Sequence, residues 1–150
     1  MQRAIRIREA TDSDFGAVMR LYRQLNPEDP VLEDGSDQAA YEQIMKTKGL
    51  QIFVCELDGR IAATCYLNIV PNVTRRASPY GIIENVVTEV SLRGKGLGKA
   101  VVSHALQQAW SAGCYKVMLQ TGSQRESTHA FYRACGFTDE KVAFVARPPE

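Results

Sequence analysis

Three glycines within five residues separate a β-rich run from a run with helical spacing. The loop between them reads Arg93, Gly94, Lys95, Gly96, Leu97, Gly98 and Lys99. The β-rich run is Ile82–Val90, and apolar residues recur at helical spacing from Leu97 to Ala112. Glycine lets successive backbone N–H groups face one concavity, and the start of a helix adds partial positive charge. The pattern therefore predicts a strand–loop–helix unit whose loop binds phosphate.

Two common phosphate loops do not match this spacing. The dinucleotide fingerprint G-x-G-x-x-G would need a glycine at position 99, which is Lys99. The P-loop would need a glycine in place of Arg93 and a hydroxyl residue in place of Ala100. A plain tight turn is the alternative, but it does not account for three basic residues among three glycines. We interpret the segment as a phosphate-binding loop of another kind.

The charge of the chain is balanced overall and uneven locally. Eighteen Lys and Arg residues face seventeen Asp and Glu residues, which is not the signature of a nucleic-acid or membrane-surface protein. From Val90 to Arg125, however, there are five basic residues and no acidic one. The near-neutral total therefore conceals a local site for an anion.

Length and composition predict one domain spanning residues 1–150. A chain of this size can bury a hydrophobic core without disulfides or a structural metal. No linker or internal repeat divides it. Its start lacks the apolar run of a signal peptide, and no stretch approaches the roughly 18–20 apolar residues of a membrane span. We expect a cytoplasmic protein with no metal, because the four cysteines show neither a C-x-x-C pair nor metal spacing.

The element order predicts an α/β (α+β) fold with a mixed sheet and helices on both faces. Helices are expected from about Thr11 to Leu25, from Ser36 or Asp37 to near Gly49, over 97–112 and over 127–134. Strands are expected over 4–8, 51–57, 60–69, 82–90, 116–120 and 141–146, with a loop over 71–79. The Asp58-Gly59 turn predicts a hairpin that pairs Cys55 with Ala62, so that Cys55 and Cys65 lie on opposite faces as reduced core residues.

Two motifs identify a family resemblance. Arg93–Gly98 resembles the [RQ]-x-x-G-x-[GA] pyrophosphate loop of the GNAT superfamily of acyl-CoA N-acetyltransferases, and Phe131–Phe137 resembles its later F-Y-x-x-x-G-F signature. The element order also fits that family. Among its subfamilies, the chain resembles glucosamine-6-phosphate N-acetyltransferases. It departs from them at Asn85, where they have an acidic residue, and in a longer stretch between Gln120 and Tyr132.

The resemblance implies a mostly antiparallel sheet in which two neighbouring strands splay apart to hold acetyl-CoA, the cosubstrate. Backbone groups of Val86, Val87 and Thr88 would then pair with the pantetheine arm and the thioester carbonyl. The N–H groups of Gly94–Lys99 would hold the pyrophosphate, and Ser127 and Arg133 would add contacts from the later helix.

The resemblance also implies a catalytic pair. Glu84 corresponds to a glutamate that acts as base in the sugar-phosphate subfamily, through a water molecule because a carboxylate does not easily deprotonate an ammonium ion. Tyr132 corresponds to the tyrosine that protonates the CoA thiolate. The alternatives are an ion pair between Glu84 and Arg75 or Arg76, and an aromatic packing role for Tyr132.

The acceptor is expected to be the primary amine of a small molecule. Six acidic residues and no basic one lie between Arg23 and Lys46, which suits a cationic amine, whereas Arg75 and Arg76 suit a phosphate or carboxylate. With Asn85, these arginines are the expected substrate contacts. A non-catalytic acyl-CoA sensor and an acetyltransferase for protein or peptide amines remain as alternatives. No nucleic-acid or membrane partner is expected. Members of the resembled family often dimerise, so the resemblance implies that a homodimer can form.

Overall fold

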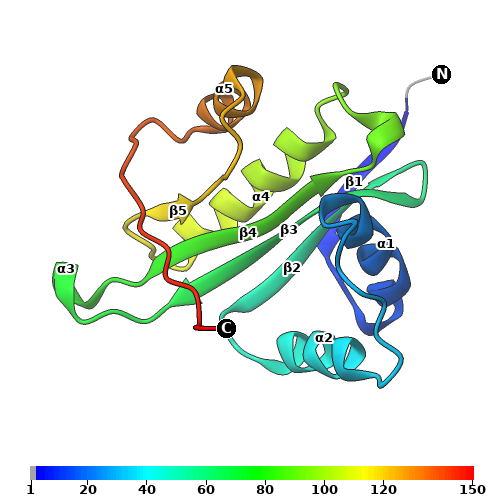
Figure 1. Ribbon diagram of the computed structural model, residues 1–150. Coiled ribbons are helices and arrows are strands. Elements are labelled where there is room, and N and C mark those ends of the chain that lie inside the picture. Colours follow the sequence, from blue (N-terminus) through cyan, green and yellow to red (C-terminus); the bar gives the residue numbers. More distant parts are fainter. Residues whose placement is uncertain (1–2) are drawn as a thin grey trace. The chain divides into compact units, whose positions relative to one another are not determined.

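The sheet has five strands in the order β1-β2-β3-β4-β5, as the computed structural model, which describes residues 3–150, shows (Figure 1). The strands are β1 (Ile5–Glu9), β2 (Leu50–Leu57), β3 (Arg60–Val70), β4 (Tyr80–Thr88) and β5 (Val117–Leu119). The first three pairings are antiparallel, and only β4 and β5 run parallel. The predicted mixed, mostly antiparallel sheet is therefore confirmed.

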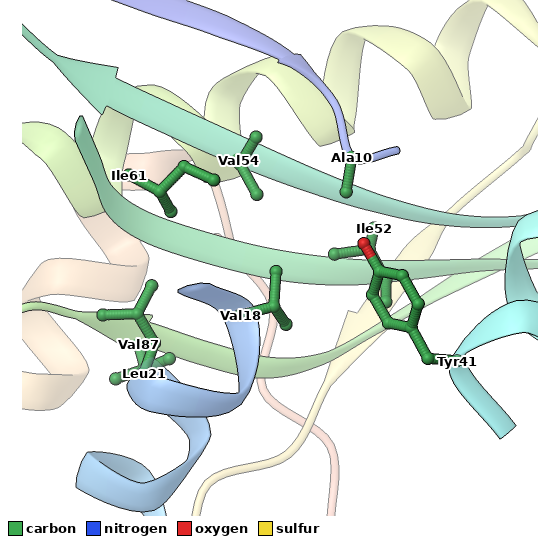
Figure 2. Packing of buried hydrophobic residues seen from close by; sticks show 8 residues of the cluster. All are labelled: Ala10, Val18, Leu21, Tyr41, Ile52, Val54, Ile61 and Val87. Atoms are coloured by element: carbon green, nitrogen blue, oxygen red, sulfur yellow. The ribbon is translucent and has the colours of Figure 1, made fainter. Parts of the chain in front are cut away.

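One face of the sheet is covered by α1 (Phe15–Leu25) and α2 (Ser36–Lys46). A short 3₁₀ turn, η1 (Asp12–Asp14), leads into α1. Figure 2 shows the packing: Val18 and Leu21 of α1 meet Val54 and Val87 of the sheet, and the four side chains are at most 4% exposed. These apolar residues recur at helical spacing in α1 and on one face of each strand, which is why this face of the sheet becomes core.

The opposite face is covered by α4 (Leu97–Ser111). The Phe53 ring lies edge-on to His104 with ring centroids 4.9 Å apart, and Cys65 Sγ lies 3.6 Å from the Val101 carbonyl. Val101 and Val102 are fully buried. Helices on both faces were predicted. Because α4 begins at Leu97, within the glycine loop, its packing fixes the last part of that loop.

The hairpin of β2 and β3 differs from the predicted register. Leu57 pairs with Arg60 as expected, but a bulge next to Ile61 makes Cys55 pair with Ala63 instead of Ala62. Phe53 then pairs with Cys65, so Cys55 and Cys65 share one face rather than opposite faces. A bulge adds one residue to one of the two strands, and its position cannot be predicted from the turn residues alone. Both thiols are buried, and neither cysteine forms a disulfide among the described residues.

The chain divides into two compact units, the first ending at Leu119 and the second covering Gln120–Glu150. The second unit contains α5 (Glu126–Cys135), which ends at Gly136 in a left-handed conformation (φ 114°). The strand predicted over 141–146 is wrong, because residues 136–150 form no regular element. Val142 and Phe144 alternate as in a strand but are 84% and 94% exposed. Alternation alone does not make a strand, which also needs a partner for its backbone groups. The single domain over 1–150 stays a prediction.

A partly buried ion cluster joins β1 to the start of α1. Arg8 contacts Asp14 (Nη1–Oδ2 2.6 Å) and Glu56 (Nη2–Oε1 2.9 Å). The Thr11 backbone N–H donates to Asp14 Oδ2 at 2.8 Å, closing a capping box. The hydrogen bond from Arg8 is the main reason that the pKa of Asp14 falls from 3.8 to about 2.

We predict that Asp14→Asn lowers the free energy of unfolding by about 2 kcal/mol at pH 7. Because the folded-state pKa is lowered, the ionised carboxylate stabilises the fold above pH 3.8, and this contribution is lost as the pH falls toward 2. Urea unfolding at a series of pH values measures the difference between variant and unchanged protein. Asp12→Asn, which alters an exposed neighbour, is the matched control. A difference for Asp14→Asn that does not shrink with falling pH would contradict the assignment.

Candidate active site

β4 loses regular pairing on both sides near its middle. Its pairing with β5 ends where Ile83 meets Leu119, so the edge of β4 from Glu84 onward has no β5 partner. On the other side, Thr64 pairs with Val87 and Tyr66 pairs with Glu84, which leaves one extra residue on β4. The parallel pairing of β4 with β5 thus stops after three residues, and the splaying of these strands stays a prediction.

A bulge at Asn85 accounts for the extra residue. Asn85 has a left-handed backbone (φ 53°), a conformation that asparagine tolerates better than most residues. Because the bulge shifts the alternation by one, Glu84 and Val87 lie on the same face of β4. Val87 packs in the core beneath α1, and Val86 and Thr88 are half-buried. Backbone groups at the bulge are thereby freed from the sheet and available to a ligand.

Glu84 is exposed on the face of the sheet that α1 and α2 cover. Its cross-strand partner is Tyr66, which packs against the core cluster on that face. Within residues 3–150, no ion pair joins Glu84 to Arg75 or Arg76, so the alternative role as a structural ion-pair partner has no support. Glu84 is thus an exposed carboxylate beside the bulge, and its role as a base stays a prediction.

The glycine loop leads from the end of β4 into α4. After Thr88 the chain forms a 3₁₀ turn, η2 (Val90–Leu92), and then Gly94 and Gly96 both adopt left-handed backbones (φ 80° and 81°). A Cβ on either glycine would meet nothing within 4 Å, so the backbone conformation, not crowding, requires glycine there.

Gly96 is the N-cap of α4 and has no side chain to cap the first turn. The N–H groups at the start of the helix are therefore available to an anion. Arg93, Lys95 and Lys99 are exposed around them, and Arg93 Nε lies 3.4 Å from the Thr88 carbonyl. Leu97 and Gly98 are buried, so they can contribute only backbone groups. This arrangement suits a pyrophosphate.

Basic and aromatic side chains gather where β4 begins. Within the predicted loop, α3 (Thr74–Ala77) has left-handed backbone at Arg75 and Arg76. The Arg75 guanidinium lies 5.8 Å from the Tyr115 ring centroid, and Lys116 Nζ lies 5.7 Å from that of Tyr80 and 5.3 Å from that of Tyr115. We call Arg75, Tyr80, Tyr115 and Lys116 the basic–aromatic patch. No carboxylate among the described residues lies within 4 Å of either cation.

The second unit holds the other predicted site residues. Tyr132 packs edge-on to Phe131 and Phe137, with ring centroids 5.1 and 6.1 Å apart. Ser127 is exposed, and Arg133 pairs with Glu126 (2.8 Å) and Glu140 (3.8 Å). The structure thus gathers Glu84, Asn85 and the glycine loop in the first unit, and Tyr132, Ser127 and Arg133 in the second.

Sequence reasoning missed three polar side chains around β4. Two of them, Tyr115 and Lys116, belong to the basic–aromatic patch. An aromatic residue next to a basic one was the sequence feature that could have indicated this patch. The Tyr22 hydroxyl of α1 is buried and interacts with the Asn85 side chain at the bulge, and nothing in the sequence marks it. Burial raises its pKa above the usual range, which keeps it a neutral phenol.

Residues 3–150 contain no cluster of three or more His, Cys, Asp or Glu side chains suited to a metal ion. Over the same residues, none of the helices has both the length and the apolar character needed to cross a bilayer.

The comparison with protein families decides what this site belongs to. Residues 17–137 match the model of the acetyltransferase (GNAT) family. The chain is a GNAT acetyltransferase. Four curated proteins named N-acetyltransferases match over 89–96% of the chain. The predicted family and enzyme class are confirmed.

Two kinds of curated relatives resemble this GNAT acetyltransferase. One is a glucosamine 6-phosphate N-acetyltransferase of Trypanosoma brucei brucei, 32% identical over 89% of this chain and 88% of its own. The other is an aminoglycoside N(6′)-acetyltransferase type 1 of Stenotrophomonas maltophilia, 29% identical over 96% of this chain and 94% of its own. The comparison confirms acetyl transfer to amines as the family activity and leaves the acceptor of this chain open.

Solved structures give the same fold. A protein from Agrobacterium tumefaciens str. C58 superposes with a TM-score of 0.90 at 45% identity, covering 95% of this chain and 99% of its own. The glucosamine-6-phosphate N-acetyltransferase of Arabidopsis thaliana superposes with a TM-score of 0.83 at 30% identity, covering 96% and 98%. The sheet with its surrounding helices is thus that of the GNAT family.

Proposed function

We propose that this GNAT acetyltransferase transfers the acetyl group of acetyl-CoA to the primary amine of a small molecule. The observation that carries the proposal is the arrangement of β4: its edge opens from β5 beside Glu84, and it ends in a loop whose N–H groups and cations suit a pyrophosphate. A thioester laid along the open edge would bring its carbonyl to the bulge and its pyrophosphate to α4.

The reaction is a direct displacement. The neutral amine attacks the thioester carbonyl carbon, a C–N bond forms, and collapse of the tetrahedral intermediate breaks the C–S bond. A water held by Glu84 takes the proton from the amine, and Tyr132 gives a proton to the departing thiolate. Backbone N–H groups of Val86–Thr88 stabilise the oxyanion.

The loop and the second unit supply the cofactor contacts. In this proposal N–H groups of Gly94–Lys99 hold the pyrophosphate, while Arg93, Lys95 and Lys99 supply charge. Ser127 and Arg133 add contacts from α5. Since Arg133 pairs with Glu126 and Glu140, its contact with the cofactor would require exchange of these partners.

We infer an amino sugar as the acceptor class, because both kinds of named relatives act on amino sugars. The basic–aromatic patch favours one that carries a phosphate or another anion, since Arg75 and Lys116 have no carboxylate partner within 4 Å. Arg76 and Asn85 would add contacts. A cationic aminoglycoside is the second candidate, favoured by the six acidic residues between Arg23 and Lys46.

Arg75→Gln combined with Lys116→Gln should raise the KM for glucosamine 6-phosphate about tenfold, because charged hydrogen bonds to the anion are lost. The KM for acetyl-CoA should stay within about twofold. Lys48→Gln, at an exposed lysine away from the patch, is the matched control. An unchanged KM for glucosamine 6-phosphate in the double variant would remove the patch from the acceptor site.

An amine panel tests the function itself. Acetyl-CoA is offered with glucosamine 6-phosphate, an aminoglycoside, an amino acid and a peptide, and release of the CoA thiol is measured. Turnover with a small amine supports the proposal. Binding of acetyl-CoA without thiol release from any acceptor would favour a sensor, and turnover with the peptide alone would favour a protein acetyltransferase.

A further inference from the structure

The chain leaves the sheet directly before the glycine loop. The last contact with β3 is the Glu89 N–H, which donates to the Ala62 carbonyl at 2.7 Å. The next residue, Val90, has no strand beside it, and its side chain is 59% exposed. Neither sheet pairing nor burial therefore fixes the segment that leads into the loop.

A side chain from α1 takes the place of the missing strand. The Gln24 amide donates from Nε2 to Glu89 Oε2 at 3.0 Å, and its Oε1 accepts from the Val90 N–H at 2.9 Å. One side-chain amide thus bonds two successive residues, one through a carboxylate and one through the backbone. The bond from the Val90 N–H replaces one that a neighbouring strand would otherwise accept, and the bond to the carboxylate holds the Glu89 side chain.

Arg20 reinforces the same point from one turn earlier on α1. Its Nη1 binds Glu89 Oε2, and its Nη2 donates to the Ile61 carbonyl at 2.9 Å. The Glu89 side chain is only 15% exposed, and the hydrogen bonds from Gln24 and Arg20 lower its pKa. Glu89 therefore stays ionised and holds both partners.

The helix that carries these two side chains is itself fixed. Val18 and Leu21 of α1 are fully buried against the sheet, so Gln24 projects from a rigid frame. The four residues from Glu89 to Leu92 connect this anchored point to the glycine loop through η2, whose Leu92 N–H donates to the Glu89 carbonyl at 2.9 Å.

We propose that Gln24 is a positioning residue for acetyl-CoA, which holds Glu89 and Val90 so that the glycine loop stays in the conformation that binds pyrophosphate. The assignment rests on the proposed function. Through Gln24, α1 would contribute to cofactor binding without contacting the cofactor. The sequence motif of the glycine loop does not predict this contribution.

Gln24→Ala should raise the Kd for acetyl-CoA, measured by titration calorimetry, and the KM for acetyl-CoA about tenfold, because two hydrogen bonds are lost. The kcat at saturating acetyl-CoA and the KM for the acceptor should stay within about twofold. Hydrogen–deuterium exchange in a peptide covering residues 89–97 should be about threefold faster or more, with exchange in the sheet unchanged. Gln38→Ala, at an exposed glutamine of α2, is the matched control.

A charge exchange separates this role from a general loss of stability. Gln24→Glu alone opposes two carboxylates and should weaken acetyl-CoA binding more than Gln24→Ala does. Adding Glu89→Gln restores one amide facing one carboxylate, and should return the Kd to within about threefold of the unchanged protein. Failure of this rescue would overturn the assignment.

Two further results would overturn it. An unaltered Kd in Gln24→Ala, when the unchanged protein binds acetyl-CoA, would refute the role of Gln24 alone. Absence of acetyl-CoA binding by the unchanged protein would refute the proposed function and the role of Gln24 with it, even if exchange in residues 89–97 still responded to Gln24→Ala.

Discussion

Glu84→Gln is expected to lower kcat about a hundredfold while leaving the Kd for acetyl-CoA within about twofold. Glutamine has nearly the same shape, so the bulge at Asn85 and the pairing with Tyr66 should persist. What is lost is the carboxylate that accepts the amine proton through water. Steady-state thiol release with a saturating acceptor measures the effect, and Glu42→Gln, at an exposed glutamate of α2, is the control.

The acceptor itself provides a sharper test of Glu84. An amine that is already neutral at pH 7, such as an acyl hydrazide, has no ammonium proton to lose before attack, so its kcat should fall less in Glu84→Gln than the kcat for an alkylamine does. An equal deficit for both amines would mean that Glu84 contributes something other than proton removal. A kcat within about twofold of the unchanged protein would exclude it from the chemistry.

Tyr132→Phe should also lower kcat about a hundredfold, because the thiolate loses its proton donor. Phenylalanine keeps the edge-on contacts with Phe131 and Phe137, so α5 should remain folded. Thermal unfolding checks this, and Tyr41→Phe, at a tyrosine of α2 whose hydroxyl donates to the Thr11 carbonyl, is the control for loss of a hydroxyl.

The pH distinguishes a proton donor from a packing residue. A free thiol has a pKa of about 8.5, so above that pH the thiolate is a stable product and needs no proton. The reduction in kcat caused by Tyr132→Phe should therefore become smaller as the pH rises toward 9. A deficit that is constant with pH, or a loss that follows the melting temperature, would assign Tyr132 to packing.

The elements that sequence patterns predicted well are those that carry their own periodicity. Val18 and Leu21 mark α1, and Asp58-Gly59 marks the turn between β2 and β3, because local spacing and turn chemistry suffice for both. The glycine loop was also predictable, since a left-handed backbone at Gly94 and Gly96 is a requirement that few residues other than glycine meet.

The features that escaped prediction depend on partners far away in the chain. The bulge next to Ile61 and the absence of a strand over 141–146 are both decided by which backbone groups are available alongside. Gln24 meets Val90 across sixty-six positions of sequence, and Lys116 meets Tyr80 only because β5 lies beside β4. Such contacts have no local signature, so the role of Gln24 could not be predicted from residues alone.

The extra residue at Asn85 restricts how β4 can change in length. Ile83 and Glu84 face opposite sides of the sheet, and Val87 returns to the side of Glu84 only because one residue is inserted between them. Deleting a single residue there would turn either Glu84 away from the proposed acceptor or Val87 out of the core, whereas exchanging Asn85 for another residue that tolerates a left-handed backbone would disturb neither. Position 85 is thus limited to residues that tolerate this backbone, and both residues between Glu84 and Val87 are needed to keep these two side chains on one face.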